Sequence, residues 1–421
     1  TLHPTITQEW VHVTSSVTLT VNATGSPTPT YRWFRNGTAI SGATGAMLTI
    51  SSLQKSDSGS YYAEATVTPT NCPALKANSN TVVVRPLYVA QVSSGGGFAL
   101  AVMNDGSVWG WGRNDYGQLG DNSGSDGHPE PRRNPYISDV RTVSAGAWHS
   151  LFLKNDGTVY SCGRNSYGEL GLGDQTQRYD PQKISVPQNL RLQAVSAGHQ
   201  RSLILAENGT AYYFGGWDEN PSVTSPAYMM SNVSAVTVTA NQYWMISDGD
   251  LYGRGDNGGA VYPELYMKGV RSVSGRRNGS LILKTSGKLL GVAGNGMGEF
   301  GVGTTTFIAD SVDIETSGVI MADKSSNHSM YIKSGVLYVC GENHYGQFGD
   351  GTTGRSFVFL PNSLINAGEI ASIALGGGIS PANDGGFTMI LKTDGTLWSC
   401  GHYYALGYNS GSNPNLRKIE F

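Results

Sequence analysis

Short runs in which apolar and polar residues alternate recur along most of the chain. In residues 143–174 one such run contains Leu151 and Leu153, an Asn-Asp-Gly turn follows at Asn155, and a second run begins at Val159 and leads into a Gly-rich loop. Alternation with a period of two around a glycine turn is typical of a β-hairpin and not of a helix. The same order of features returns elsewhere, so residues 143–174 form one unit of a repeat.

Turn dipeptides mark the repeats. Each dipeptide lies between two short apolar runs, and successive dipeptides are 38 to 60 residues apart. That spacing is typical of the blades of a β-propeller and is too long for leucine-rich or ankyrin units. The sequence therefore predicts seven repeats, with turns at Asp105-Gly106, Asp156-Gly157, Asn208-Gly209, Asp248-Gly249, Ser286-Gly287, Ser334-Gly335 and Asp394-Gly395.

Residues 1–86 follow a different pattern. Trp33 lies in a short run that ends at an Asn-Gly turn, and Tyr61 follows an Asp-Ser-Gly-Ser sequence. These residues resemble an immunoglobulin-like domain, in which a core tryptophan and a tyrosine corner hold such positions. The resemblance implies a β-sandwich, although Val21 and Ala63 stand where the family usually has its disulfide cysteines.

The repeats carry a longer signature. Val-Ser-Ala-Gly is followed by His-Ser, then by Asp-Gly-x-Val, and then by Gly-Arg-Asn-x-Tyr-Gly-x-Leu-Gly. This signature resembles the RCC1 repeat, whose family folds as a seven-bladed β-propeller. Residues 111–120, 163–171 and 341–349 match it best, whereas the third and fourth repeats lack the Tyr-Gly-x-Leu-Gly end.

The expected fold is all-β, with an immunoglobulin-like β-sandwich in residues 1–86 and a seven-bladed RCC1-like β-propeller in residues 87–421. We expect residues 414–421 to pair beside the strands of the first repeat, because shared N- and C-terminal strands would close the ring and leave no open edge. The chain begins at Thr1 without an initiator Met or a signal peptide, which indicates a piece of a longer or processed protein.

Two loops of each blade are expected to share one face, because connections between antiparallel strands alternate between the two faces. The tips of these loops vary among the repeats, and aromatic and arginine side chains there are of the kind that supplies binding hot spots. An alternative is that the aromatic tips cap the central channel. The candidate partner-binding residues are Phe98, Trp148, His199, Arg201, Gln242, Tyr243, Arg276, Arg277 and Asn327.

Little in the sequence indicates chemistry. His149 and His328 hold the same repeat position before a serine, which favours a structural hydrogen bond repeated by the fold over catalysis. The Gly-x-Gly-x-Gly sequence at Gly294 lies in a repeat loop and lacks the strand-to-helix turn of a dinucleotide site. The aspartates of the loops match no calcium-loop spacing. We expect no enzymatic activity, no cofactor and no bound metal.

Charge and cysteines narrow the choice of partners and setting. The net charge is −3 and the pI is about 6.2, so the chain has no overall positive field that would attract nucleic acid. It contains no run of 18 apolar residues, which membrane insertion as a helix would require. We expect buried free thiols at one equivalent position of three repeats, while the fourth cysteine, Cys72, has no partner in the first domain. The three equivalent residues are Cys162, Cys340 and Cys400.

The leading hypothesis is a non-enzymatic, monomeric binding or adhesion module at a bacterial cell surface or outside the cell, with a protein as the partner. Immunoglobulin-like domains joined to RCC1-like repeats resemble parts of bacterial secreted or surface proteins. Within the RCC1-like family a secreted bacterial inhibitor holds its target enzyme on one propeller face, so inhibition of a secreted enzyme is a less favoured interpretation. The alternative is carbohydrate recognition, with Trp148, Trp217, Tyr243 and Trp244 as stacking platforms. Exchange-factor activity on a small GTPase is disfavoured by the lack of a basic tail.

Overall fold

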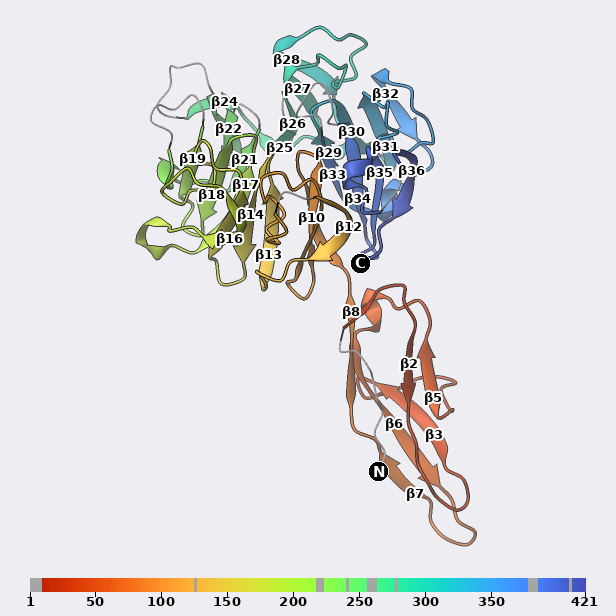
Figure 1. Ribbon diagram of the computed structural model, residues 1–421. Coiled ribbons are helices and arrows are strands. Elements are labelled where there is room, and N and C mark those ends of the chain that lie inside the picture. Colours follow the sequence, from red (N-terminus) through yellow and green to blue (C-terminus); the bar gives the residue numbers. More distant parts are fainter. Residues whose placement is uncertain are drawn as a thin grey trace. The chain divides into compact units, whose positions relative to one another are not determined.

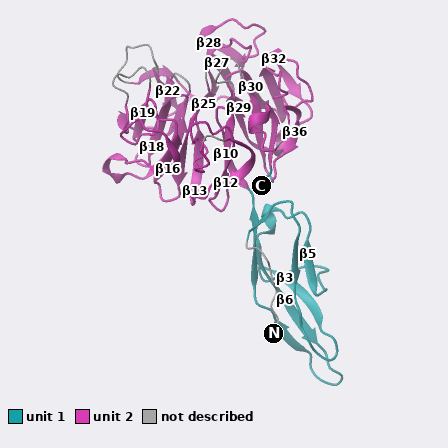
Figure 2. Ribbon diagram, in the orientation of Figure 1, with its two compact units in different colours: residues 1–88, 394–396 teal, residues 89–393, 397–421 magenta. Residues whose placement is uncertain are grey.

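The computed structural model describes residues 10–124, 127–216, 223–239, 242–255, 263–276, 279–377, 385–408 and 411–421. The chain divides into two compact units, residues 1–88 with 394–396 and residues 89–393 with 397–421 (Figure 2). Both units are built from strands, and the only helices among the described residues are short 3-10 turns.

The first unit contains two sheets. Strands β1, β8, β6, β3 and β4 form one sheet in that order, with β7 on β6, and β2 pairs with β5 in the other. A single hydrophobic cluster joins the two sheets. The strands are β1 (Trp10–His12), β2 (Val17–Thr20), β3 (Thr30–Arg35), β4 (Thr38–Ala39), β5 (Met47–Ile50), β6 (Gly59–Val67), β7 (Leu75–Asn78) and β8 (Val82–Leu87).

Trp33 and Tyr61 make the contacts expected of a core tryptophan and a tyrosine corner. The Trp33 indole Nε1 donates to the carbonyl of Gly45 at 3.0 Å, and the Tyr61 hydroxyl donates to the carbonyl of Asp57 at 2.9 Å. Val21 and Ala63 are buried in the same cluster. Apolar packing therefore takes the place of a disulfide between the two sheets.

The second unit contains, within the described residues, seven four-stranded sheets, as in a propeller (Figure 1). Each sheet is called a blade below, and each uses four consecutive strands. Blades 1 to 3 are β9 (Val89–Ser94), β10 (Phe98–Met103), β11 (Val108–Gly112) and β12 (His128–Arg133); β13 (Val140–Ala145), β14 (His149–Lys154), β15 (Val159–Gly163) and β16 (Arg178–Lys183); and β17 (Leu192–Ala197), β18 (Arg201–Ala206), β19 (Ala211–Gly215) and β20 (Ala227–Met230).

The other four blades follow the same order along the chain. Blades 4 and 5 are β21 (Ala235–Val238), β22 (Gln242–Ser247), β23 (Asp250–Gly255) and β24 (Glu264–Met267); and β25 (Val270–Gly275), β26 (Ser280–Lys284), β27 (Leu289–Gly294) and β28 (Ile308–Glu315). Blades 6 and 7 are β29 (Val319–Lys324), β30 (His328–Lys333), β31 (Val336–Gly341) and β32 (Ser356–Asn362); and β33 (Ile370–Gly376), β34 (Phe387–Lys392), β35 (Leu397–Gly401) and β36 (Asn413–Lys418).

The C-terminal strand does not join the first repeat, so that prediction was wrong. β36 pairs with β35, placing Lys418 opposite Trp398 within blade 7. The first blade already has four strands, because β9 follows the first unit directly and β12 supplies the outer edge. Blades 1 and 7 therefore meet without a shared strand, through the bond of 2.9 Å from the Ser94 hydroxyl to the Ala374 carbonyl and the bond of 3.1 Å from the Gly377 N–H to the Gly95 carbonyl.

A serine in the first strand links neighbouring blades. Ser144 accepts the backbone N–H of Ala197 at 2.9 Å, and Ser196 accepts that of Val238 at 2.8 Å. The serine of the Val-Ser-Ala-Gly motif is thus a small residue that also accepts a hydrogen bond from the next blade. This register position is called the belt position, and its occupants in blades 1 to 7 are Ser93, Ser144, Ser196, Thr237, Ser274, Asp323 and Ala374.

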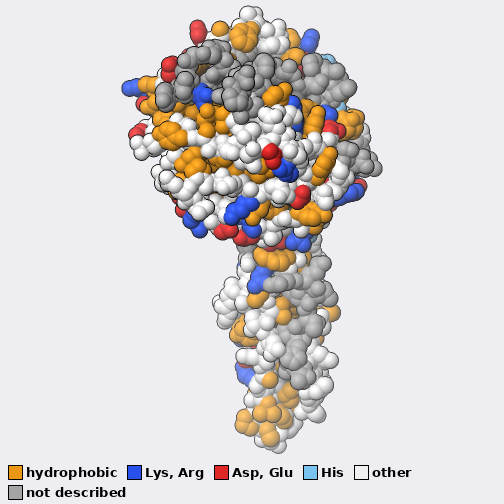
Figure 3. All heavy atoms as spheres, turned by 60° about the vertical axis from the view of Figure 1, so that its left-hand side comes forward, with side chains coloured by type: hydrophobic (Ala, Val, Ile, Leu, Met, Phe, Trp, Pro, Cys, Tyr) orange, Lys and Arg blue, Asp and Glu red, His pale blue; other side chains and the backbone are white. Residues whose placement is uncertain are grey.

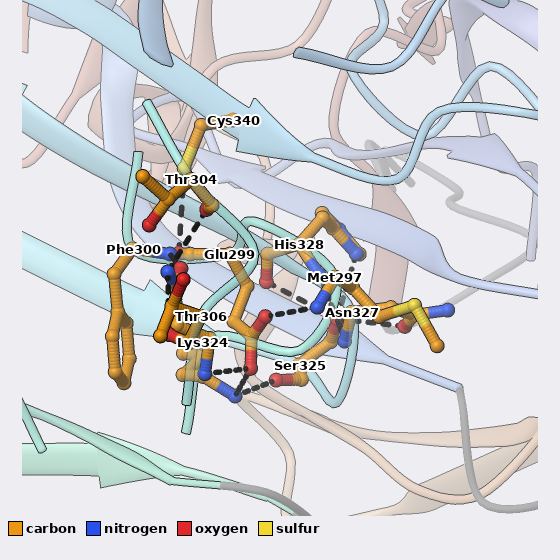
Figure 4. A network of polar contacts seen from close by, with 11 residues as sticks. Met297, Glu299, Phe300, Thr304, Thr306, Lys324, Ser325, Asn327, His328 and Cys340 are labelled. Carbon is orange, nitrogen blue, oxygen red and sulfur yellow. Dashed lines mark hydrogen bonds and ion pairs between the residues drawn. The ribbon is translucent and has the colours of Figure 1, made fainter. Parts of the chain in front are cut away.

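An asparagine organises the long loop after the third strand. The Asn295 Oδ1 accepts the N–H of Phe300 at 3.0 Å, while its Nδ2 donates to the carbonyls of Thr304 and Thr306. Glu299 accepts the N–H groups of Asn295 and Met297 at 2.9 and 2.8 Å (Figure 4). These two side chains explain the spacing of Asn and Gln or Glu in the repeat. Equivalent pairs are Asn114 with Gln118, Asn165 with Glu169, and Asn343 with Gln347.

The expected burial of the equivalent thiols is confirmed. Cys162, Cys340 and Cys400 are free and fully buried, and each lies near a backbone carbonyl of the preceding blade. Burial raises the pKa of the Cys340 thiol well above its usual value. A thiol that is kept protonated in this way is a weak nucleophile, so these cysteines act as core residues. Cys72 is exposed.

Candidate functional site

In blades 1, 2, 6 and 7 the loop after the first strand and the loop after the third strand lie side by side on one face of the second unit. The N–H of Arg164, in the long loop of blade 2, donates to the carbonyl of Trp148, in the loop after the first strand, at 2.9 Å. Arg113 makes the same bond to Gly97 in blade 1, also at 2.9 Å. The prediction that these loops share a surface is confirmed for these four blades. This surface is called the loop face below.

A row of stacked arginine and aromatic side chains crosses blades 1 and 2 on the loop face. The Arg113 guanidinium lies 5.0 Å from the ring centre of Trp148, and the Trp148 and Tyr116 rings meet edge to face at 5.5 Å. The Arg164 guanidinium lies 5.8 Å from Tyr116 and 5.0 Å from Tyr167. All five side chains are half-buried. They are called the arginine–aromatic row.

Ion pairs hold the two arginines of this row in place. Arg113 Nε donates to Asp115 at 2.8 Å, and Arg164 lies 3.7 Å from Glu169. The Glu169 side chain is fully buried, and burial raises its pKa although backbone hydrogen bonds and the nearby Arg164 act in the opposite direction. Each guanidinium is therefore positioned before any partner arrives, with one aromatic face beside it.

A tyrosine cluster lies on blades 6 and 7. The ring centres of Tyr345 and Tyr403 are each 4.5 Å from the ring of His402, and Tyr404 is 4.3 Å from Tyr403. The tyrosines are 36%, 41% and 38% exposed for Tyr345, Tyr403 and Tyr404. Burial, with the positive charge of Arg113 nearby, lowers the pKa of His402 to about 4, so the imidazole is neutral at pH 7. The Trp111 indole, two residues before Arg113, donates to the carbonyl of Ala405, next to Tyr404, at 3.0 Å, so the cluster lies close to the arginine–aromatic row.

Three of the residues expected at the surface are buried. Phe98 is 0%, Arg201 3% and Tyr243 2% exposed, so they were wrongly assigned to the binding face. Phe98 and Arg201 are the first residues of β10 and β18, and Tyr243 is the second residue of β22. Their side chains pack within and between the blades. For example, the Arg201 guanidinium of blade 3 lies 5.2 Å from the ring centre of Tyr243 in blade 4. Trp244, expected to form a carbohydrate platform with Tyr243, is also buried.

The other predicted residues lie on or near the loop face. Trp148 is part of the arginine–aromatic row, and His199 and Arg276 line a central cavity. Gln242 begins β22, and Asn327 accepts a hydrogen bond from Ser325. These five residues are half-buried. Arg277 and Trp217 lie outside the described residues.

Sequence reasoning missed Arg113, Tyr116, Arg164 and Tyr167. The motif Gly-Arg-Asn-x-Tyr-Gly served to recognise the repeat, and the candidate residues were taken only from the loop after the first strand of each blade. The Asn side chain bonds to the loop backbone, whereas the Arg and Tyr side chains lie toward the surface. The recurrence of Arg and Tyr around a structural Asn was the signal that could have identified them.

The two histidines of the repeat are structural, as expected. His149 Nε2 lies 2.9 Å from the Ser202 hydroxyl, which donates to the Glu169 carbonyl. Because the serine proton is directed at that carbonyl, the imidazole must be the donor to the serine oxygen. His328 makes the same contact to Thr388 at 3.0 Å. Burial lowers the pKa of both histidines to about 3.

No charged surface dominates the visible face of the molecule. Figure 3 shows Lys and Arg side chains interspersed with Asp and Glu among apolar side chains. Within the described ranges, no group of three or more His, Cys, Asp or Glu residues is arranged to hold a metal ion. None of the described helices is long and apolar enough to cross a membrane.

Family models match both parts of the sequence. Two models of the regulator of chromosome condensation (RCC1) repeat match residues 105–153 and 156–205, and residues 89–118 and 140–169. The chain carries RCC1 repeats. An immunoglobulin-domain model matches residues 1–66.

Curated relatives share the repeat region. The ultraviolet-B receptor UVR8 of Arabidopsis thaliana is 24% identical over 288 residues, which are 66% of this chain and 59% of that protein. The human probable E3 ubiquitin-protein ligase HERC6 is 36% identical over 137 residues, which are 32% of this chain and 13% of that protein. The chain thus spans less than two thirds of the length of these relatives.

Solved structures agree on the fold. The structure of Kap60 bound to yeast RCC1 (Prp20) aligns with a TM-score of 0.59 and 20% identity, and covers 69% of this chain and 78% of that chain. Human WBSCR16 aligns with a TM-score of 0.58 and 19% identity, and covers 83% of this chain and 97% of that chain. At these identities the likeness is one of fold.

Proposed function

We propose that this chain is a non-enzymatic binding module that holds a protein partner on the loop face. An immunoglobulin-like sandwich accompanies a closed seven-bladed propeller, and the arginine–aromatic row and the tyrosine cluster form the contact surface. The setting we propose is a bacterial cell surface or the extracellular space. Protein binding has a precedent in this fold, since yeast RCC1 has been solved with Kap60 bound.

The arginine–aromatic row is the observation that carries this proposal. Arg, Tyr and Trp are the residues most enriched in interface hot spots. Stacking between Arg113 and Trp148 and between Arg164 and Tyr167 restricts these side chains in the free protein, which lowers the entropy lost on binding. The loop is shaped by Asn165 and Glu169 and does not require the arginine or tyrosine side chains.

The test compares two double variants of the full chain for retention of protein from cell-surface extracts. Trp148→Ala with Arg164→Ala should weaken binding by roughly 30-fold or more, which corresponds to about 2 kcal/mol. The matched control is Tyr136→Ala with Arg191→Ala. Tyr136 and Arg191 are exposed and lie in loops beside the Asn-Asp-Gly turns, where Arg191 contacts the Asn155 carbonyl. Equal binding by both variants and the unmodified chain would place the contact surface elsewhere.

A carbohydrate ligand is the second candidate, and the tyrosine cluster favours it. Exposed aromatic rings can stack on sugar rings, and Tyr403 and Tyr404 lie on the loop face with about two fifths of their surface accessible. Retention on a glycan array that is lost in Tyr403→Ala with Tyr404→Ala, without protein capture, would assign this function instead.

A further inference from the structure

The first strands of six blades surround a central cavity of about 180 Å³. Most of its wall is small and belongs to the repeat frame, as with Ser144, Ala197 and Gly198. Blades 5 and 6 depart from this frame. They place an arginine, an aspartate and a lysine in the wall of the same cavity, which are Arg276, Asp323 and Lys324.

Arg276 occupies a register position that is glycine in blades 2 and 3. Gly275 pairs with Ser280 and Ala145 pairs with Ser150, so Gly275 and Ala145 hold the same register position. Arg276 directly follows Gly275, as Gly146 directly follows Ala145. Its Nε donates to the Leu375 carbonyl at 3.0 Å, and its Nη1 donates to the Ala145 carbonyl at 3.4 Å. A guanidinium has five N–H groups in a planar fork, so the Nη2 group remains for another acceptor.

Asp323 occupies the belt position of blade 6. Its Oδ2 accepts the backbone N–H of Leu375 at 2.8 Å and so fulfils the structural role that serine has in blades 2 and 3. Its Oδ1 adds an acceptor that serine does not provide. Burial raises the pKa of Asp323 to about 6, although the Leu375 N–H and the charge of Arg276 act in the opposite direction. The carboxylate is therefore mainly ionised at neutral pH.

The neighbouring Lys324 also lines the cavity and its charge favours the ionised form of Asp323, but its ion-pair partner is Glu299. Its ammonium is fully buried, donates to the Ser325 carbonyl at 2.8 Å and lies 3.7 Å from Glu299, as Figure 4 shows. The charge of Lys324 is thus balanced by a carboxylate that does not line the cavity. Arg276 and Asp323 remain as the opposite charges available to the cavity.

We propose that the central cavity binds a small zwitterion that carries a carboxylate and an ammonium group a few bonds apart, as in a free α-amino acid. The Arg276 Nη2 group donates to the ligand carboxylate, and the Asp323 Oδ1 accepts from the ligand ammonium. The cavity volume of about 180 Å³ favours a ligand of few heavy atoms. Glycine, alanine and serine are the amino acids of matching size.

The repeat frame itself does not require this pair of charges. Serine at the belt position and glycine after the first strand serve blades 2 and 3 without buried charge. Buried ion pairs often stabilise a protein no more than apolar or neutral replacements do. The competing explanation is a brace, because Arg276 joins carbonyls of blades 2 and 7. A brace would affect stability but would bind no ligand.

Titration calorimetry of the full chain at pH 7.5 separates these explanations. Glycine or L-alanine should bind, whereas acetate and methylammonium, each with one of the two charges, should bind at least ten-fold more weakly, even when mixed. Asp323→Ser and Arg276→Gly restore the residues of blade 2 and should each weaken amino-acid binding at least ten-fold. Asp313→Ser, on the outer strand β28, is the matched control and should bind as the unmodified chain does.

Two results would overturn the proposal. If the unmodified chain gives no heat of binding with glycine, alanine or serine, Arg276 and Asp323 form a brace and not a binding site. This measurement does not depend on the folding of any variant. Amino-acid binding that persists in folded Asp323→Ser would move the ligand to another site. Neither result bears on the loop face, since protein capture there is tested with Trp148 and Arg164.

Discussion

At the scale of single residues, the repeat uses one register position for very different side chains. The first residue of the second strand is histidine in blades 2 and 6, but phenylalanine in blades 1 and 7 and arginine in blade 3. The two histidines hydrogen-bond to the next blade, His149 to Ser202 and His328 to Thr388. These bonds require a neutral imidazole whose proton is on Nε2.

Acid should therefore destabilise the second unit through these two histidines. Their pKa of about 3 in the folded chain is below the value of 6.5 for the free side chain. The stabilisation is present above pH 6.5 and is lost as the pH falls toward 3. Each histidine should contribute a slope of about 1.4 kcal/mol per pH unit to the free energy of unfolding.

Urea unfolding between pH 7.5 and pH 4 measures this slope. In His149→Gln with His328→Gln, the free energy of unfolding should fall less steeply with pH, by about two bound protons. Arg164 and His199 act on His149, and Lys324 acts on His328, so these charges remain in the variant. An unchanged slope would mean that other groups take up the protons.

At the scale of strands and loops, the hairpins could be predicted because period-two alternation and glycine turns are local signals. Burial of individual tips could not be predicted, because it depends on where a strand begins and on the neighbouring blade. Phe98 was placed in a loop, yet it is the first residue of β10 and belongs to a core cluster shared with blade 2. Arg276 was expected at the surface, but its register position directs it into the central cavity.

The belt position explains how separate sheets stay in register, and it gives a second prediction. Ser144→Ala removes the acceptor of the Ala197 N–H, and a buried N–H without a partner costs about 1 to 3 kcal/mol. Ser274→Ala is the matched control, because within the described residues the Ser274 hydroxyl has no hydrogen-bond partner. Chemical denaturation should show a clear loss for the first variant and little for the second. Equal losses would contradict a role of the belt in joining blades.

At the scale of the whole second unit, the repeat predicted the blades but not how their ends meet. Residues 414–421 were expected to supply a strand to blade 1, and instead β36 completes blade 7. A strand-level signal cannot decide between these arrangements, because an outer strand pairs with either sheet through the same backbone groups. The contacts between blades 1 and 7 include a main-chain bond from Gly377 to Gly95 and particular side chains, such as Trp111, whose indole Nε1 donates to the Ala405 carbonyl at 3.0 Å.

The C-terminal residue therefore takes part in the junction between blades 1 and 7. The Phe421 ring meets Trp109 and Trp111 edge to face at 5.7 and 5.9 Å, and such pairs contribute about 0.5 to 1.5 kcal/mol each. Phe421→Ala should lower the free energy of unfolding of the second unit by about 1 to 3 kcal/mol. Phe307→Ala is the control, because this side chain is 65% exposed and lies outside the junction. If both variants melt alike, blades 1 and 7 must be held together by the main-chain and serine contacts alone.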